Sequence, residues 1–181
     1  MKEHIVEIKK LIPQHYCNKI IAYFSDNKED ASTVGGTDKS IRNCTLTNVL
    51  DANSFGKKII LNYVKEKIFL AVEEYKKKFS FVNVEKISQL DLLEYEANEY
   101  KAGYKFHTDF GTSCQERLLS ISICLNNDFS GGEFMFDLNG EIICYPQNVG
   151  DCIIFPSNFM FPHQVNKITQ GTRYALIGWV V

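Results

Sequence analysis

A histidine and an aspartate stand two residues apart in the segment YKFHTDFG, as His107 and Asp109. On an extended strand, residues at this spacing project from the same face, so both side chains can bind one metal ion. The pair alone does not define a metal site, because His-x-Asp also occurs by chance. A metal site therefore requires another ligand elsewhere in the chain.

A further candidate ligand is His163, in the segment FMFPHQV. Two imidazoles and one carboxylate on one face of an octahedron form the ligand set of non-haem iron(II) centres, whose opposite face stays open. Zinc more often takes a closed tetrahedral set, or three protein ligands and one water. The ligand types at His107, Asp109 and His163 therefore favour iron over zinc.

Arg173 follows His163 by ten residues, in the segment GTRYALIGWV. In a strand its side chain shares a face with Trp179, so a guanidinium and an indole would line the same interior. A planar, permanently charged guanidinium suits bidentate binding of a carboxylate. In the alternative interpretation, Arg173 is a surface salt-bridge partner and Trp179 is ordinary core.

The elements that must position these residues lie mainly in the second half of the chain. From residue 87 onward, short runs rich in Ile, Val, Phe and Tyr are punctuated by Gly, Asn, Asp and Pro. This pattern predicts strands at 87–95, 104–109, 117–125, 132–136, 141–144, 151–155, 161–166 and 173–180. Such a series, preceded by helices, predicts a mainly β fold: a sandwich or a jelly roll (double-stranded β-helix) with helices packed on one sheet.

The predicted strand RLLSISICLNN alternates with period two. Its apolar side suits packing against the N-terminal helices and consists of Leu119, Ile121, Ile123 and Leu125. The opposite side carries Ser120, Ser122 and Cys124. Small polar side chains there would leave space inside the barrel for a small polar ligand.

Residues 1–86 predict a mostly helical support region. One apolar stripe at helical spacing follows Pro13, and a longer one runs from Ile60 to Phe79. Between them, residues 28–40 are polar and contain glycine, which predicts a loop. We favour a surface connection for this segment, with a mobile substrate lid over residues 28–50 as the alternative.

Length and composition limit the classes of function. A chain of 181 residues suits a single compact domain, and its formal net charge of -2 makes a nucleic-acid partner less expected. No apolar run approaches the roughly 20 residues that cross a bilayer. The six cysteines include no Cys-x-x-Cys pair, which favours free thiols over disulfides or zinc. We expect a soluble cytoplasmic protein without a membrane partner.

Five motifs in order over residues 87–181 resemble the prolyl 4-hydroxylase-like branch of the 2-oxoglutarate and iron(II) dependent dioxygenases. They are HTD, RLLSISICLNNDFSGGEFMF, VGDCIIFPSN, FPHQV and GTRYALIGW. The resemblance implies a single oxygenase domain with a jelly-roll catalytic core at 87–181. It is weaker in residues 1–80, where DKSIRN is similar to a substrate-side segment of that family.

The resemblance also implies roles for individual residues. Iron(II) would be bound by His107, Asp109 and His163, and the C5 carboxylate of 2-oxoglutarate by Arg173. Tyr95 is similar to the tyrosine that helps to hold the co-substrate, and Tyr100 is the competing candidate. The turn at Gly131, Gly132 and Glu133 matches a Gly-Gly-Glu turn that we interpret as structural.

The chain departs from the family at Cys124, where prolyl hydroxylases commonly carry a tyrosine that contacts the same carboxylate. Ser122, Thr172 or water could replace that contact. Trp179 stands where the nucleic-acid demethylases of the superfamily usually have another arginine, which makes demethylation of alkylated nucleic acid the weaker alternative.

The implied reaction is hydroxylation of a C–H bond, most directly of a prolyl residue in a peptide or protein. It would consume O₂, give succinate and CO₂, and use ascorbate as reductant. Other amino-acid side chains or free amino acids are alternative substrates. A non-catalytic jelly-roll binding module is the alternative from a different functional class.

Overall fold

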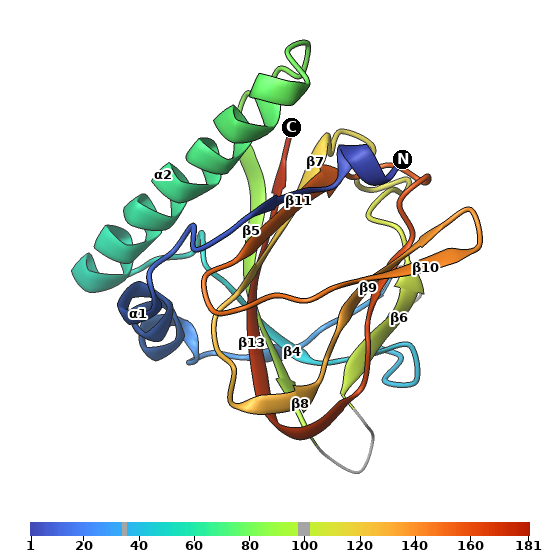
Figure 1. The fold of residues 1–181 in the computed structure, drawn as a ribbon. Coiled ribbons are helices and arrows are strands. Elements are labelled where there is room, and N and C mark those ends of the chain that lie inside the picture. Colours follow the sequence, from blue (N-terminus) through green and yellow to red (C-terminus); the bar gives the residue numbers. More distant parts are fainter. Residues whose placement is uncertain (34–35, 98–101) are drawn as a thin grey trace.

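The computed structural model describes residues 1–33, 36–97 and 102–181. In these ranges two antiparallel sheets and two α-helices form three layers, with the helices against the outer face of one sheet (Figure 1). The predicted fold class, mainly β with N-terminal helices and a double-stranded β-helix, is confirmed.

The larger sheet has eight strands. Seven follow the order β1-β11-β7-β13-β5-β4-β2, and β8 pairs with β13. Their bounds are β1 Val6–Ile8, β2 Glu29–Asp30, β4 Thr45–Asn48, β5 Ile87–Glu96, β7 Leu119–Cys124, β8 Phe129–Gly131, β11 Cys152–Pro156 and β13 Ile168–Val180. The long strand β13 pairs with β5 on one edge and with β7 on the other, which places Arg173 opposite Tyr95.

The smaller sheet has five strands in the order β10-β9-β12-β6-β3. Their bounds are β3 Arg42–Asn43, β6 Gly103–His107, β9 Phe134–Leu138, β10 Glu141–Tyr145 and β12 His163–Val165. In the antiparallel pair of β6 and β12, His107 lies directly opposite His163. The register of this sheet therefore brings the two histidines together.

Helices α1 (Gln14–Phe24) and α2 (Phe55–Lys78) cover the outer face of the larger sheet. The Ser54 hydroxyl caps α2 by accepting a hydrogen bond of 3.3 Å from the Lys57 backbone N–H. A stripe that includes Ile60, Val64 and Ile68 is buried against the sheet. Truncating Ile68, which is fully buried, to alanine would cost about 2–5 kcal/mol of stability.

The two faces of β7 separate as the alternation predicts. Leu119, Ile121 and Ile123 belong to the core beneath the helices. Ser120 and Ser122 line the cavity between the sheets. A second core between the sheets is rich in aromatic residues and includes Phe134, Phe136, Tyr145, Phe155 and Phe161.

The predicted loop at residues 28–40 contains the short strand β2, and β3 and β4 follow it along the chain. β4 extends the larger sheet beside β5, and β3 extends the smaller sheet beside β6. Strands of two to four residues are too short to show a period in the sequence. β1 and β8 were not predicted for the same reason. The described part of residues 1–86 thus contains four strands, β1 to β4, as well as the helices.

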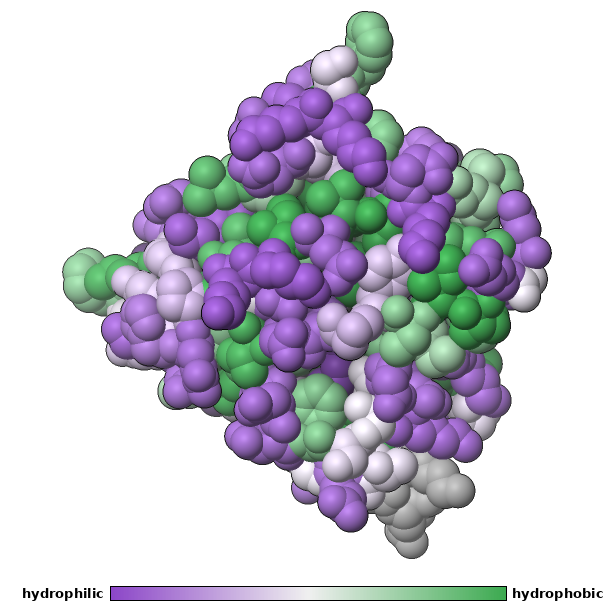
Figure 2. Space-filling model, viewed as in Figure 1, coloured by the Kyte–Doolittle hydropathy of each residue, from purple (hydrophilic) through white to green (hydrophobic). Residues whose placement is uncertain are grey.

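Hydrophilic and hydrophobic residues are interspersed over the face shown in Figure 2, which has the same orientation as Figure 1. No helix within the described ranges combines the length and the apolar character needed to span a membrane.

Candidate active site

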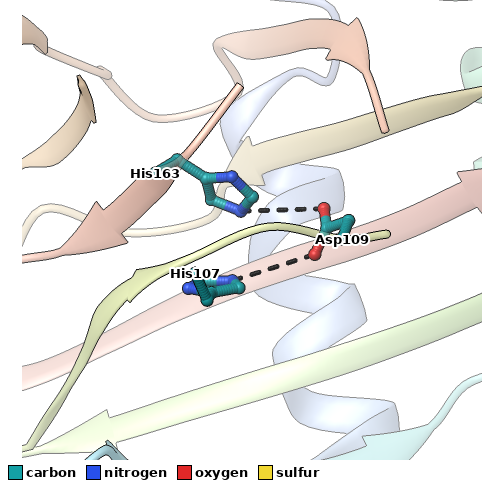
Figure 3. Close-up of side chains that lie close together, drawn as sticks. All are labelled: His107, Asp109 and His163. Carbon is teal, nitrogen blue, oxygen red and sulfur yellow. Dashed lines mark ion pairs between the residues drawn. The ribbon is translucent and has the colours of Figure 1, made fainter. Parts of the chain in front are cut away.

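His107, Asp109 and His163 converge between the two sheets (Figure 3). Each offers one ligand atom, and these atoms all lie within 4.8 Å of one another. The Nε2 atom of His107 lies 3.8 Å from Asp109 Oδ1, and the Nε2 atom of His163 lies 3.6 Å from Asp109 Oδ2. Three donors facing a common point make this a candidate metal centre.

Asp109 lies beyond the strand that was predicted to carry it. β6 ends at His107, so the strand alternation that predicted a shared face does not extend to Asp109. Its carboxylate is instead held by Ser120 on β7, whose hydroxyl donates a hydrogen bond of 2.6 Å to Oδ2. The Ser120 hydroxyl also lies 2.8 Å from that of Ser157. Two buried hydroxyls thus fix the orientation of the Asp109 carboxylate.

Backbone carbonyls orient both imidazole rings. His107 Nδ1 lies 2.9 Å from the Lys105 carbonyl oxygen, and His163 Nδ1 lies 3.0 Å from the Phe161 carbonyl oxygen. A carbonyl oxygen can only accept, so each Nδ1 carries the proton and each Nε2 presents a lone pair toward Asp109. This is the tautomer in which a histidine binds a metal through Nε2.

The electrostatic environment favours a neutral His107 and an ionised Asp109. Burial lowers the pKa of His107, and the neighbouring His163 lowers it further, which keeps the imidazole neutral. Burial raises the pKa of Asp109, but His163, His107 and the Ser120 hydroxyl act in the opposite direction and leave it below its ordinary value. A neutral imidazole and an ionised carboxylate are the forms that bind a divalent cation.

Aromatic rings enclose the histidines. Tyr104 stacks on His107 with ring centres 3.4 Å apart, and Phe134 stacks on His163 with ring centres 5.4 Å apart. Phe155 meets His163 edge-on at 4.9 Å. These contacts hold the rings in place and exclude water from one side of the site.

A cavity of about 300 Å³ opens beside the candidate metal centre. Three residues predicted to contact the co-substrate line it: Tyr95, Ser122 and Trp179. Thr172, the other protein candidate for the contact missing at Cys124, is not among the lining residues. Tyr100 lies outside the described residues.

Arg173 lies behind the cavity wall rather than on it. Its side chain is 1% exposed, and its guanidinium carbon lies 5.6 Å from the ring centre of Tyr95. Nη2 donates a hydrogen bond of 3.2 Å to Gln147 Oε1, whereas Nη1 is buried and has no partner in the described part of the chain. A buried guanidinium with a free donor is suited to an entering carboxylate.

The hydroxyl of Ser122 is a second buried group without a hydrogen-bond partner among the described residues. Leaving a buried donor unsatisfied costs about 1–3 kcal/mol, so such groups commonly point to a ligand. The donors of Arg173 and Ser122 therefore fit a carboxylate-bearing co-substrate.

The Gly-Gly-Glu turn packs against the side chain of Arg173. A Cβ atom on Gly131 would lie 2.1 Å from the Lys167 carbonyl oxygen. On Gly132 it would lie 2.9 Å from Cδ of Arg173, and both glycines have positive φ angles, +79° and +71°. The interpretation of this turn as structural is confirmed, because the glycines allow close packing beside the arginine.

Several residues of the site were not predicted from the sequence: Arg42, Gln89, Tyr104, Arg117 and Gln147. Arg42 belongs to the DKSIRN segment, whose likeness to a substrate-side segment was its only signal. Arg117 lies 3.9 Å above the Trp179 ring and donates a hydrogen bond of 2.7 Å to Gln89 Oε1. These side chains come together from separate elements, so no spacing along the chain reveals them.

Comparison with known protein families gives a match to the 2OG-Fe(II) oxygenase superfamily over residues 92–181. A PKHD-type hydroxylase from Colwellia psychrerythraea is 32% identical over 84 residues, which are 43% of this chain and 37% of that protein. Another, from Rippkaea orientalis, is 26% identical over 187 residues, which are 97% of this chain and 78% of that protein. The first match thus spans well under two thirds of the relative's length.

Among solved structures, one similar fold is a prolyl hydroxylase from Trichoplax adhaerens in complex with a hypoxia inducible factor peptide fragment. The TM-score is 0.82 at 13% identity, with 98% of this chain and 83% of that chain covered. A prolyl-4-hydroxylase from Pseudomonas putida has a TM-score of 0.74 at 16% identity, with 98% and 91% covered. The family match, the similar hydroxylases and the five motifs show that the chain belongs to the 2OG-Fe(II) oxygenase superfamily, and its fold is like that of the prolyl 4-hydroxylases.

Proposed function

We propose that this protein is a 2-oxoglutarate and iron(II) dependent dioxygenase that hydroxylates a prolyl residue in a peptide or protein. The observation that carries the proposal is the pairing of two features inside one fold. The first is the convergent set of His107, Asp109 and His163. The second is the buried Nη1 atom of Arg173 behind the adjoining cavity, which has no hydrogen-bond partner among the residues that the structure describes.

In this proposal, Nε2 of each histidine and the Asp109 carboxylate hold the iron on one side and leave its other side open to the cavity. When bound, iron(II) and 2-oxoglutarate supply the oxidative chemistry: O₂ converts the co-substrate to succinate and CO₂ and places one oxygen atom in the substrate C–H bond. Ser120 keeps Asp109 aimed at the metal.

Arg173 would bind the C5 carboxylate through its free Nη1, and Ser122 would donate a second hydrogen bond to the same group. Tyr95 packs against the guanidinium and limits its movement. Trp179 and Phe155 line the same cavity and would exclude water from the reacting atoms.

The preference for a prolyl substrate is supported by similarity to a putative prolyl 4-hydroxylase and by the shared fold of a prolyl hydroxylase in complex with a peptide fragment. A free amino acid or another side chain is the alternative substrate. Demethylation of nucleic acid has less support, because the net charge is -2. Cytoplasmic location stays a prediction.

Incubation of the purified protein with iron(II), ascorbate, 2-oxoglutarate and a panel of proline-containing peptides would test the proposal. We expect succinate release together with the gain of one oxygen atom on a prolyl residue, detected by mass spectrometry. His163→Ala should abolish both. The proposal would be wrong if the wild-type protein bound neither iron nor 2-oxoglutarate in equilibrium titrations.

A further inference from the structure

Two arginines line the cavity near the candidate metal centre, and each is backed by an aromatic ring of a different sheet. The guanidinium of Arg42 lies 4.8 Å above Tyr104 of β6, in the smaller sheet. The guanidinium of Arg117 lies 3.9 Å above Trp179 of β13, in the larger sheet. Stacking on a ring restricts the conformations of a guanidinium while its edge remains available for hydrogen bonds.

Neither arginine is neutralised by a carboxylate. In the parts of the chain that the structure describes, no Asp or Glu oxygen lies within 4.0 Å of either guanidinium. Arg42 donates to the Ser32 carbonyl at 3.0 Å, and its buried Nε has no partner in the same ranges. The hydrogen bonds of Arg117 go to a neutral amide, Gln89, and to a backbone carbonyl.

The charges around the cavity therefore do not balance. A divalent metal and Arg173 would offset the Asp109 carboxylate and a dianionic co-substrate. Arg42 and Arg117 then remain as two positive charges with no carboxylate at salt-bridge distance among the described residues. The buried Asp91 interacts with both charges at longer range and accepts a hydrogen bond of 2.6 Å from Gln89, but it is a single carboxyl group and does not line the cavity.

We propose that Arg42 and Arg117 select a substrate that carries a carboxylate near the hydroxylated carbon. This inference rests on the proposed function and specifies its substrate class. The carboxylate belongs either to an Asp or Glu side chain beside the target proline or to a free C-terminus at that proline. Both sources offer the planar, two-oxygen acceptor that a guanidinium binds bidentately.

The arginines also lie close enough to the reaction centre to align the substrate. Tyr104, which carries Arg42 on one face, stacks on His107 with ring centres 3.4 Å apart. Arg117 contacts Trp179 and the backbone oxygen of Asp109 at 3.5 Å. A carboxylate held by these arginines would lie in the same cavity that His107, Asp109 and His163 line.

Equilibrium binding of matched peptides tests the proposal. The probes are fluorescent proline peptides with Glu or Gln beside the proline, and peptides ending at proline as a free acid or as an amide. Binding is measured by anisotropy with manganese(II) and 2-oxoglutarate in the absence of O₂. We expect the wild-type protein to bind the charged member of at least one pair at least about tenfold more tightly.

The variants Arg42→Gln and Arg117→Gln should each remove most of this discrimination, whereas Arg42→Lys and Arg117→Lys should retain part of it. Lys67→Gln is the matched control, because Lys67 also lies over an aromatic ring, 5.2 Å from the Tyr63 ring centre, but on α2 outside the site. Lys67→Gln also removes one positive charge and should leave the discrimination between charged and neutral peptides unchanged.

The pair of peptides that is discriminated identifies the source of the carboxylate. Equal binding of charged and neutral members in both pairs, with 2-oxoglutarate still bound, would overturn the inference and leave the proposed function intact. Discrimination that survives both glutamine substitutions would overturn it as well. Failure to bind 2-oxoglutarate would instead count against the proposed function.

Discussion

The Ser120 hydroxyl and the Asp109 carboxylate are joined by a buried hydrogen bond of 2.6 Å, which links β7 of the larger sheet to the residues that follow β6 of the smaller one. Because this bond orients a proposed metal ligand, Ser120→Ala should weaken iron binding by about 10–100-fold. Anaerobic titration with iron(II) would measure the change. Ser122→Ala is the control on the same strand face and should leave iron affinity near the wild-type value.

Arg173 should govern affinity for 2-oxoglutarate rather than for iron. Arg173→Gln removes the charge and should raise the dissociation constant for 2-oxoglutarate at least about tenfold, because hydrogen bonds between charged groups contribute about 1.5–3 kcal/mol. Arg173→Lys keeps the charge without the planar fork and should bind with intermediate affinity. Equal affinities in all three proteins would contradict the assignment of Arg173 as the anchor.

Gly132 should be needed for the same anchor. Gly132→Ala introduces a Cβ atom 2.9 Å from Cδ of Arg173 and 2.4 Å from Cδ1 of Ile168, at a positive φ of +71°. We expect a loss of stability of about 1–3 kcal/mol together with weaker 2-oxoglutarate binding. Gly140→Ala is the matched control: its φ is +86°, but the added atom meets nothing within 4 Å. It should lose stability and keep its affinity for 2-oxoglutarate.

Asp151 should make stability depend on acid pH. Burial raises the pKa of its carboxyl, but the Lys10 and Asn148 backbone N–H groups and the Lys9 ammonium lower it below the ordinary value overall. A group with a depressed pKa in the folded state stabilises the protein above its unfolded pKa of about 3.9, and this contribution is lost as pH falls through the folded pKa.

Urea unfolding of Asp151→Asn at several pH values would check this dependence. The variant should be less stable than the wild type by about 1–2 kcal/mol at pH 7, and the difference should shrink below about pH 4. Asp128→Asn, which changes an exposed carboxylate, should follow the wild-type curve throughout. A difference that stayed constant down to acid pH would rule out the ionised carboxylate as its cause.

The sequence predicted the chemistry of the site better than its surroundings. The order of the histidine, aspartate and arginine motifs can be recognised in the sequence without knowledge of the intervening structure. The convergence of His107, Asp109 and His163 could therefore be predicted. Their roles toward iron remain a prediction. The inward side of β7 was also predictable, because its alternation continues over a full strand.

Other parts of the site could not be predicted, for two physical reasons. β3 and β4 are too short to show a period, so the strand that brings Arg42 to the cavity was not predicted. Gln147 and Arg117 depend on loops that approach the cavity from separate parts of the chain, and only tertiary packing brings them there. The sequence pattern of residues 104–109 is compatible with a strand throughout, so the end of β6 at His107 could not be predicted.

β13 carries Arg173, Ile177 and Trp179 on its inner side and is hydrogen-bonded along both edges. A slip of one residue in its register would turn this whole row toward the helices and point Tyr174 and Leu176 inward. Such a slip would remove Arg173 and Trp179 from the cavity together. Affinity for 2-oxoglutarate should therefore report on the folded state of the larger sheet and should decrease as that sheet unfolds.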